Sequence, residues 1–247
     1  MSKISDAFKK GKAFIAFVTA GDPNLETTEK FVLEMKRSGA DIIELGIPFS
    51  DPIAEGPVIQ EANLRALASG TTVSKIFDMV KRIREKSQIP LVFLTYINPV
   101  LKYGYDAFFA KCKETGVDGI IIPDLPFEEQ AEIPNRHGID LIPLVAPTSE
   151  ARIRKIAAVA EGYLYVVSSL GVTGMRSEIK TDLKSIINIA RETAKVPIAV
   201  GFGINTPEQA SQISKIADGV IVGSAIVKII AEKKSVGEYV KKMKEAI

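Results

Sequence analysis

Cysteine and histidine are almost absent from this sequence, since its 247 residues include one of each. The lone cysteine, Cys112, excludes a disulfide framework and a thiolate metal cluster within one chain, which suits a reducing cytoplasm. With one histidine, a metal site would have to consist of oxygen ligands, and no spacing of carboxylates indicates such a site. We therefore expect no metal, and the sequence offers no convincing Ser–His–Asp triad.

Long apolar runs are also missing, because no run approaches the roughly 18 residues that a membrane-spanning helix needs. The first apolar stretch, at 13–20, follows basic residues as in a signal peptide, but Gly21, Asp22 and Pro23 end it at once. We expect this stretch to be a core strand instead. The 32 basic residues, against 30 acidic ones, are scattered over helix faces without interleaved aromatics. Neither a membrane nor nucleic acid is an expected partner, and the expected location is the cytoplasm.

Short β-rich apolar runs recur along the chain, and longer segments with helical spacing separate them. The eight runs cover 13–19, 41–47, 90–96, 117–124, 140–147, 163–169, 197–203 and 218–224. Continuous apolar strands that alternate eight times with helices indicate parallel strands covered on both faces. The sequence thus predicts an α/β fold, a (β/α)8 TIM barrel with a parallel eight-stranded core. No linker or shift in composition marks a boundary, so residues 1–247 are expected to form a single domain.

Aspartates lie at the starts of four predicted strands: Asp41, Asp118, Asp140 and Asp218. The starts of the strands form the bottom of a barrel, where residues serve stability rather than chemistry. We therefore exclude these four aspartates as catalytic candidates.

Glu44 is the ionisable residue that stands out in the second half of a predicted strand, and Asp124 at the end of another strand is the second. Side chains alternate across a strand, so Glu44 shares a face with Ile42 and should point toward the mouth of the barrel. Burial among apolar side chains raises the pKa of a carboxyl, which makes Glu44 a candidate general acid. The alternative is a structural carboxylate that accepts hydrogen bonds from backbone N–H groups or from a buried tyrosine.

Glycine-rich segments follow the last three predicted strands: LGVTG at 170–174, VGFGIN at 200–205 and VGSAIVK at 222–228. In barrels, the loops after strands seven and eight and the amino end of a short helix commonly bind phosphate. Gly203 and Gly223 would let the backbone approach the anion, and Ser224 would add a hydroxyl donor. The alternative is that these glycines only form tight turns. Because no Gly-x-Gly-x-x-Gly or Walker pattern occurs, the expected ligand is the size of a sugar phosphate.

Aromatic and aliphatic residues near the strand ends could form walls for a flat hydrophobic ring, although such residues often belong to the core. They are Phe17, Leu94, Tyr96, Ile121, Tyr165 and Phe202. Lysine is absent from all eight predicted strands, which argues against a Schiff-base aldolase.

Five motifs, in this order, resemble the alpha subunit of tryptophan synthase over essentially the whole chain: FVTAGDP at 17–23, ELGIPFSDP at 44–52, GVTG at 171–174, GFGI at 201–204 and VGSAIVKII at 222–230. The resemblance implies a (β/α)8 barrel and a lyase that cleaves indole-3-glycerol phosphate to indole and glyceraldehyde 3-phosphate in tryptophan biosynthesis. It also implies a beta-subunit partner in an alpha–beta–beta–alpha heterotetramer. Pyridoxal phosphate would then belong to the beta subunit, and this chain would carry no cofactor. A sugar-phosphate isomerase or aldolase is an alternative that the five motifs disfavour.

Matched to the family's motifs, Glu44 corresponds to the glutamate that protonates the indole ring carbon, so that the carbon–carbon bond breaks in a retro-aldol step. Phe17 and Leu94 would enclose the indole ring, with Tyr165 near the glycerol chain. The residues expected to hold the phosphate are Gly174, Gly203, Gly223 and Ser224. Further substrate contacts are expected from Tyr96, Ile121, Thr173 and Phe202.

One position departs from the family pattern, in which the motif after PFSDP ends in Ala-Asp-Gly and the aspartate helps to polarise the indole N–H. Glu55 stands at this position and is the second expected catalytic residue, with one more methylene. A misplacement of about 1 Å can cost about 100-fold in rate. The alternative function is therefore a catalytically weakened barrel that binds the substrate and mainly activates its beta subunit. The resemblance places Thr173 in a closing loop, and Pro48, Asp51 and Asn98 at the partner interface.

Overall fold

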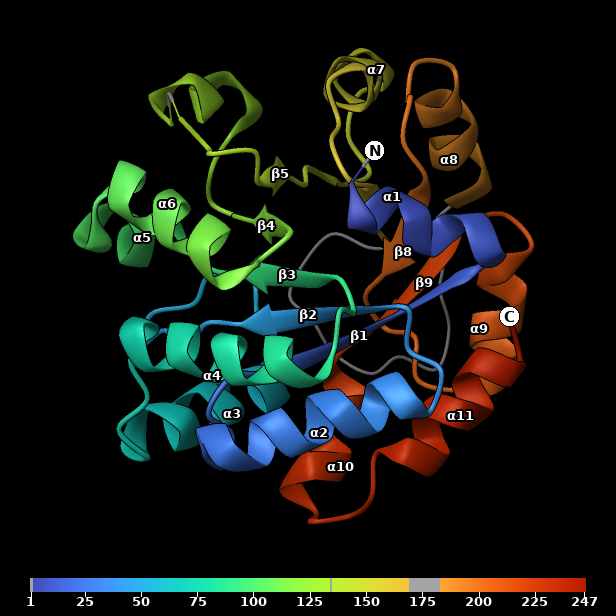
Figure 1. Ribbon diagram of the computed structural model, residues 1–247. Helices are drawn as coiled ribbons and strands as arrows, with labels where there is room; N and C mark the ends of the chain where they lie inside the picture. Colours follow the sequence, from blue (N-terminus) through green and yellow to red (C-terminus); the bar gives the residue numbers. More distant parts are fainter. Residues whose placement is uncertain (1, 134, 169–182) are drawn as a thin grey trace.

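The computed structural model describes residues 2–133, 135–168 and 183–247, which form a curled sheet surrounded by helices (Figure 1). The strands are β1 (Ala13–Thr19), β2 (Ile42–Gly46), β3 (Leu91–Leu94), β4 (Gly119–Ile121), β5 (Asp140–Leu141), β6 (Leu144–Val145), β7 (Leu164–Val167), β8 (Ile198–Gly201) and β9 (Gly219–Val222). Their order in the sheet is β5-β4-β3-β2-β1-β9-β8-β7-β6. Every neighbouring pair is parallel.

The two strands at the ends of this order, β5 and β6, are halves of one predicted strand and are separated only by Ile142 and Pro143. Pro143 has no N–H to donate, which explains the break. On one side of it, the Ile142 N–H donates to Ile120 O at 2.9 Å, beside the β4–β5 pair. On the other side, the Tyr165 N–H donates to Pro143 O at 3.1 Å, beside the β6–β7 pair. The sheet is therefore continuous around a ring, and the predicted barrel is confirmed.

Helices connect the strands and cover the outer face of the sheet. They are α1 (Lys3–Ala7), η1 (Phe8–Lys10), α2 (Leu25–Arg37), α3 (Pro57–Ala68), α4 (Val73–Lys86), α5 (Ile97–Tyr103), α6 (Tyr105–Thr115), η2 (Phe127–Glu132), α7 (Glu150–Ala158), α8 (Leu183–Arg191), α9 (Pro207–Ser214), α10 (Ser224–Ala231) and α11 (Gly237–Glu245). Side chains of Asn24, Thr72 and Thr206 cap the amino ends of α2, α4 and α9, as residues of these types commonly do. None of the described helices is long and apolar enough to cross a bilayer.

The connection between β4 and β5 differs from the expected alternation of strands with helices. It contains η2, a 3-10 helix, and its described residues form no α-helix. In the sequence, Pro126 and Pro134 flank this segment, and proline can neither donate a hydrogen bond inside an α-helix nor fit there without a clash. The fourth connection of the barrel is therefore more irregular than the sequence pattern predicts.

Side chains alternate along each strand between two apolar layers. On β1, Phe14, Ala16 and Val18 belong to the large cluster between the sheet and the helices, whereas Ile15 belongs to the cluster inside the barrel. This alternation is the one expected for a strand that is covered on both faces. Glu44 of β2 thus shares its inward face with Ile42, as predicted from the spacing.

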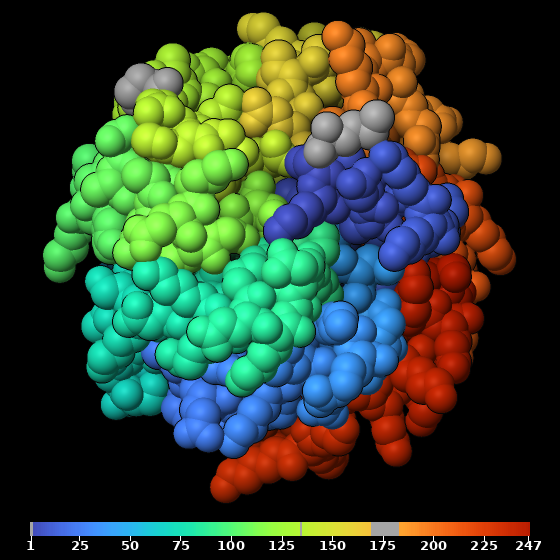
Figure 2. All heavy atoms as spheres, viewed as in Figure 1, coloured from blue at the N-terminus to red at the C-terminus, as the bar shows by residue number. Residues whose placement is uncertain are grey.

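The amino-terminal end of the barrel is closed by α1 and η1, which lie across the face shown in Figure 2 (dark blue). Ile4 is fully buried in the interior cluster, and a Cβ atom at Gly119, the first residue of β4, would lie 2.8 Å from Ile4 Cδ1. A Cβ atom at Gly219, the first residue of β9, would lie 2.9 Å from Phe8 Cε1. This end is therefore packed, and access to the interior is left to the carboxyl ends of the strands.

The aspartates at the strand starts bind the backbone of neighbouring strands. Asp41 accepts from the Phe14 N–H at 2.7 Å, Asp118 from the Leu91 N–H at 2.9 Å, and Asp218 from the Ile198 N–H at 2.9 Å. Asp140 differs, because its buried Oδ2 has no hydrogen-bond partner among the described residues. The structural role predicted for these positions is clear at Asp41, Asp118 and Asp218.

Candidate active site

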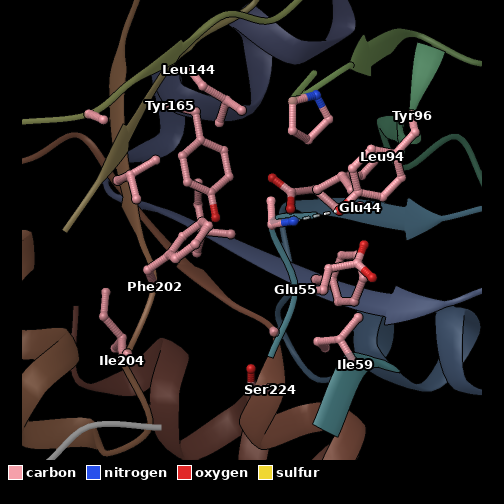
Figure 3. A pocket seen from close by; sticks show the side chains of 18 residues that line it. Glu44, Glu55, Ile59, Leu94, Tyr96, Leu144, Tyr165, Phe202, Ile204 and Ser224 are labelled. Carbon is pink, nitrogen blue, oxygen red and sulfur yellow. Dashed lines mark hydrogen bonds between the residues drawn. The ribbon is translucent and has the colours of Figure 1, made fainter. Parts of the chain in front are cut away.

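A cavity of about 400 Å³ opens at the carboxyl ends of the strands. Residues at or just beyond the ends of β3, β7, β8 and β9 line it, including Leu94, Val167, Phe202 and Gly223. Most of its lining is aliphatic or aromatic, and the carboxylates in the lining are Glu44 and Glu55 (Figure 3). Such a pocket suits a ligand with an apolar ring and a few polar groups.

The cavity brings together most of the site residues predicted from the sequence: Phe17, Glu44, Glu55, Leu94, Tyr96, Tyr165, Phe202, Gly203, Gly223 and Ser224. Ile121 does not line it and is fully buried in the interior cluster. Thr173 and Gly174 lie outside the described residues. The lining also includes Ala54, Ile59, Pro123, Leu144, Ala146, Val167, Ile204 and Ile221, which the sequence did not single out.

Glu44 is 1% exposed and lies in the middle of β2. Burial raises the pKa of its carboxyl to about 7, because the ionised form loses its hydration. Tyr163 Oη donates a hydrogen bond to Glu44 Oε1 at 2.5 Å, which favours the ionised form and acts against the shift. Glu44 therefore both lines the cavity and accepts a hydrogen bond from a buried tyrosine.

Tyr163 is a residue that sequence reasoning missed. It is fully buried inside the barrel, with its ring 5.9 Å from that of Phe8. The available signal was its position, since Tyr163 and Tyr165 share the inward face of the strand that runs into β7. Its partner Glu44 is 119 residues away in sequence. Only the closure of the barrel brings the two together.

Glu55 follows β2 in the loop that leads to α3, and it is 8% exposed. Asn63 Nδ2 donates to Glu55 Oε2 at 2.6 Å, and the phenol of Tyr96 also hydrogen-bonds this carboxyl. Burial raises the pKa of Glu55 to about 7 in spite of these two donors. Two carboxyls with a pKa near neutrality thus line one apolar cavity, which is typical of acid–base chemistry.

The aromatic walls depend on two glycines in the strands. A Cβ atom at Gly46 would lie 2.6 Å from Phe17 Cζ, and a Cβ atom at Gly201 would overlap the phenol of Tyr165. The Tyr165 and Phe202 rings meet edge to face, with centroids 6.1 Å apart and an interplanar angle of 84°. Gly46 and Gly201 therefore give the rings of Phe17 and Tyr165 the room that defines the shape of the cavity.

The predicted phosphate loops lie beside this aromatic wall. Phe202 and Gly203 both have positive φ angles, of 74° and 83°, and the hydroxyl of Ser168 donates to Phe202 O. A positive φ is strained for phenylalanine, and such strain is often found at functional sites. Gly223 is the N-cap of α10, and Ser224 is the first residue of that helix. The amino end of a helix attracts an anion through its free N–H groups and its dipole.

Asp124, the second acid noted in a predicted strand, and His137, the one histidine, do not line the cavity. Asp124 Oδ1 accepts from the Ile97 N–H at 2.9 Å at the start of α5, which is a capping role. His137 Nε2 lies 2.8 Å from Asp106 Oδ1. Among the described residues, no group of three or more His, Cys, Asp or Glu side chains could hold a metal ion.

The predicted partner residues gather near a second, wider groove of about 670 Å³. Pro48 and Asn98 line it, and Asp51 is exposed in the adjoining loop, where Ser50 Oγ donates to Asp51 Oδ2 at 2.5 Å. Large apolar side chains are exposed on the elements around this groove: Ile53 (72%), Leu64 (63%) and Leu101 (54%). Exposed apolar residues of this size around a groove are typical of a protein-binding surface.

Known proteins are similar to this chain in both sequence and architecture. The family model of the tryptophan synthase alpha chain matches residues 4–247. The tryptophan synthase alpha chain of Lacticaseibacillus casei is 53% identical, over 95% of this chain and 89% of its own length. The crystal structure of tryptophan synthase subunit alpha from Legionella pneumophila matches with a TM-score of 0.90 at 39% identity, over 100% of this chain and 98% of that chain. A chain in the crystal structure of the tryptophan synthase complex from Pyrococcus furiosus matches with a TM-score of 0.83 at 39% identity, over 96% and 98% of the two chains. This chain therefore belongs to the tryptophan synthase alpha chain family.

Proposed function

We propose that this chain is a lyase that cleaves indole-3-glycerol phosphate to indole and glyceraldehyde 3-phosphate, the alpha half-reaction of tryptophan synthase in tryptophan biosynthesis. The observation that carries the proposal is Glu44, a buried carboxyl with a pKa of about 7 that faces an apolar cavity. The cavity has aromatic walls for an indole ring and glycine loops for a phosphate. The indole ring and the phosphate of the substrate would thus each lie against groups that suit them chemically.

The reaction needs a group that gives one proton and takes another. Glu44 in its neutral form donates a proton to the indole ring carbon that carries the glycerol chain. The bond between this carbon and the chain then breaks, and its electron pair stays with the ring. The neighbouring hydroxyl of the chain loses its proton to the Glu44 carboxylate and becomes the aldehyde. A pKa near 7 suits both steps, because neither form of the carboxyl is scarce at neutral pH.

Glu55 assists at the indole nitrogen. In its ionised form, it accepts a hydrogen bond from the ring N–H and stabilises the positive charge that protonation of the ring creates. Phe17 and Leu94 enclose the ring, and Tyr165 lies toward the glycerol chain. Gly203, Gly223 and Ser224 would hold the phosphate, together with Gly174 in the segment outside the described residues.

A beta subunit is the proposed partner, in an alpha–beta–beta–alpha heterotetramer with pyridoxal phosphate in the beta chains. The groove lined by Pro48 and Asn98, with exposed Ile53, Leu64 and Leu101 around it, supports a docking surface here. The related structure from Pyrococcus furiosus is that of a tryptophan synthase complex. A cytoplasmic location and a single domain over residues 1–247 complete the proposal.

An indole-release assay on the purified chain tests the function directly. We expect indole from indole-3-glycerol phosphate and a stimulated rate after a beta subunit is added. A chain that releases almost no indole alone, yet still accelerates tryptophan formation by a beta subunit, would favour the alternative of a weakened barrel. No indole in either assay would contradict the proposal.

A further inference from the structure

Helix α3 begins directly after Glu55 and holds this residue at two points. Gly56 is the N-cap and Pro57 is the first helical residue. Gln60 Nε2 donates to the backbone O of Glu55 at 2.7 Å. Further along the helix, Asn63 Nδ2 donates to Glu55 Oε2 at 2.6 Å. The backbone and the carboxylate of Glu55 are thus both fixed by side chains of α3.

Asn63 is a polar residue in an apolar position. It is 4% exposed and shares the buried face of α3 with Ile59, Ala62 and Ala66. A buried amide costs free energy unless its polar groups find partners, and a buried carboxylate costs more. The hydrogen bond between Asn63 and Glu55 gives each of these buried polar side chains a partner and so lowers the cost of burying both.

We propose that Asn63 is a positioning residue for Glu55. Its amide holds the carboxylate at the distance from the backbone that a glutamate side chain reaches and an aspartate side chain does not. The expected effect on rate rests on the proposed lyase function. The positioning itself rests on the hydrogen bond, the burial of both residues and the way α3 is held.

Helix α3 cannot easily move to follow a shorter acid, because it is tied to the loop after β1. Arg65 makes two hydrogen bonds of 2.8 Å with the two carboxylate oxygens of Asp22, which is 1% exposed. Ser69 Oγ donates to Gly21 O at 3.3 Å. Breaking a pair with so deeply buried a carboxylate is costly, so the Asn63 amide has a fixed place relative to β1 and β2.

Other polar and charged groups also lie near Glu55. The phenol of Tyr96 hydrogen-bonds the carboxyl, and it accepts a hydrogen bond from the Ala54 N–H at 3.1 Å. Asp124 acts electrostatically on Tyr96, and Glu44 lines the same cavity as Glu55. Among the residues that the structure describes, Asn63 is therefore one of two donors to the Glu55 carboxyl, and it is the one that lies on α3.

The first test replaces the amide with an apolar side chain of similar size, Asn63→Leu. We expect kcat for indole release to fall about 10- to 100-fold with little change in KM, because a misplaced catalytic group loses rate rather than binding. Glu61→Ala, at an exposed position of the same helix, is the matched control and should keep the rate. An unchanged kcat in a folded Asn63→Leu chain would overturn the proposal.

The second test asks whether the two side-chain lengths match. Glu55→Asp should lower the rate, and adding Asn63→Gln should restore part of it, because the longer amide makes up for the shorter acid. In the Glu55→Asp background, Asn63→Leu should cost much less than it does with Glu55 present. Independent, additive effects of the two substitutions would contradict a positioning role. If Asn63→Leu alone fails to fold, the rescue of Glu55→Asp by Asn63→Gln still decides the question, and the lack of any rescue would contradict the positioning role.

The third test separates this inference from the lyase function. The Glu55 carboxyl is followed by ¹³C NMR during a pH titration, with Glu55→Gln used to assign its signal. The Asn63 hydrogen bond favours the ionised form, so Asn63→Leu should move the midpoint to higher pH. An unmoved midpoint would overturn the positioning role even in an active enzyme. A moved midpoint in a chain that releases no indole would instead refute only the lyase function.

Discussion

Glu44 carries the strongest prediction at the scale of single residues, because it takes part in both proton transfers of the proposed reaction. Glu44→Gln keeps the size and removes the acid. We expect indole release to fall by about 100- to 10,000-fold, the usual contribution of a general acid or base. Steady-state assays with indole-3-glycerol phosphate measure this, and Glu61→Gln on the exposed face of α3 serves as the control. A rate within a few-fold of the unmodified chain would refute the role.

The same substitution should change stability in a pH-dependent way. Burial raises the pKa of Glu44 from 4.5 to about 7, so the folded chain binds this proton more tightly than the unfolded chain. The free energy of unfolding should therefore decrease as the pH rises from about 4.5 to about 7, by on the order of 3 kcal/mol from this group. Glu44→Gln removes that loss. Urea unfolding at pH 5 and pH 8 should show that the variant gains stability mainly at pH 8.

Tyr163 should tune the proton of Glu44 without touching the substrate. Its hydrogen bond favours the carboxylate, so Tyr163→Phe should raise the pKa of Glu44 further. Since kcat/KM needs neutral Glu44 in the free enzyme, its decline at high pH should move to higher pH. A pH–rate profile of both chains tests this. A lower rate with an unmoved profile would show that Tyr163 serves packing alone.

At the scale of elements, the carboxyl end of β8 controls the room for the aromatic wall. A Cβ atom at Gly201 would overlap the phenol of Tyr165, so Gly201→Ala should push this ring into the cavity. We expect a higher KM for indole-3-glycerol phosphate and a loss of stability of about 1–3 kcal/mol from overpacking. Tyr165→Phe removes the oxygen nearest the new methyl group and should relieve part of the stability loss. Equal losses with and without that oxygen would argue against this clash.

The helices and strands also show which features of the fold the sequence patterns predict. The apolar runs identified every strand, because strands covered on both faces are apolar along their whole length. The break at Pro143 and the 3-10 helix η2 were not anticipated, although prolines at or beside both places give the physical reason. Periodicity thus located the elements, while hydrogen-bond geometry set their ends.

At the scale of the whole molecule, the exposed apolar residues around the second groove predict where the beta subunit docks. Leu101→Asp should weaken association with a beta subunit at least about 10-fold, because a charge placed in an apolar interface loses its hydration. Indole release by the chain alone should stay unchanged. Titration calorimetry measures the affinity, and Val159→Asp, at an apolar position on another face that is 51% exposed, is the matched control. Equal effects of both variants would contradict this docking surface.

The sequence by itself determined the barrel, the position of the acid Glu44 within a strand, and the two glycine-containing loops after the last strands. These features depend on local spacing, which is set by the geometry of strands and turns. It also pointed to Glu55 as the position where this chain departs from its family. The confirmed membership in that family strengthens the reading of ELGIPFSDPIAEGP as the centre of the site.

Only the tertiary structure decided what holds the two acids. Tyr163 donates to Glu44 across 119 residues of sequence, and Asn63 on α3 donates to Glu55 in the loop before that helix. It also placed Ile121 in the core rather than in the cavity wall. Such pairings depend on how the barrel closes and how its helices pack. Local spacing does not encode these distances, and so the partners of the Glu44 and Glu55 carboxyls became visible only in three dimensions.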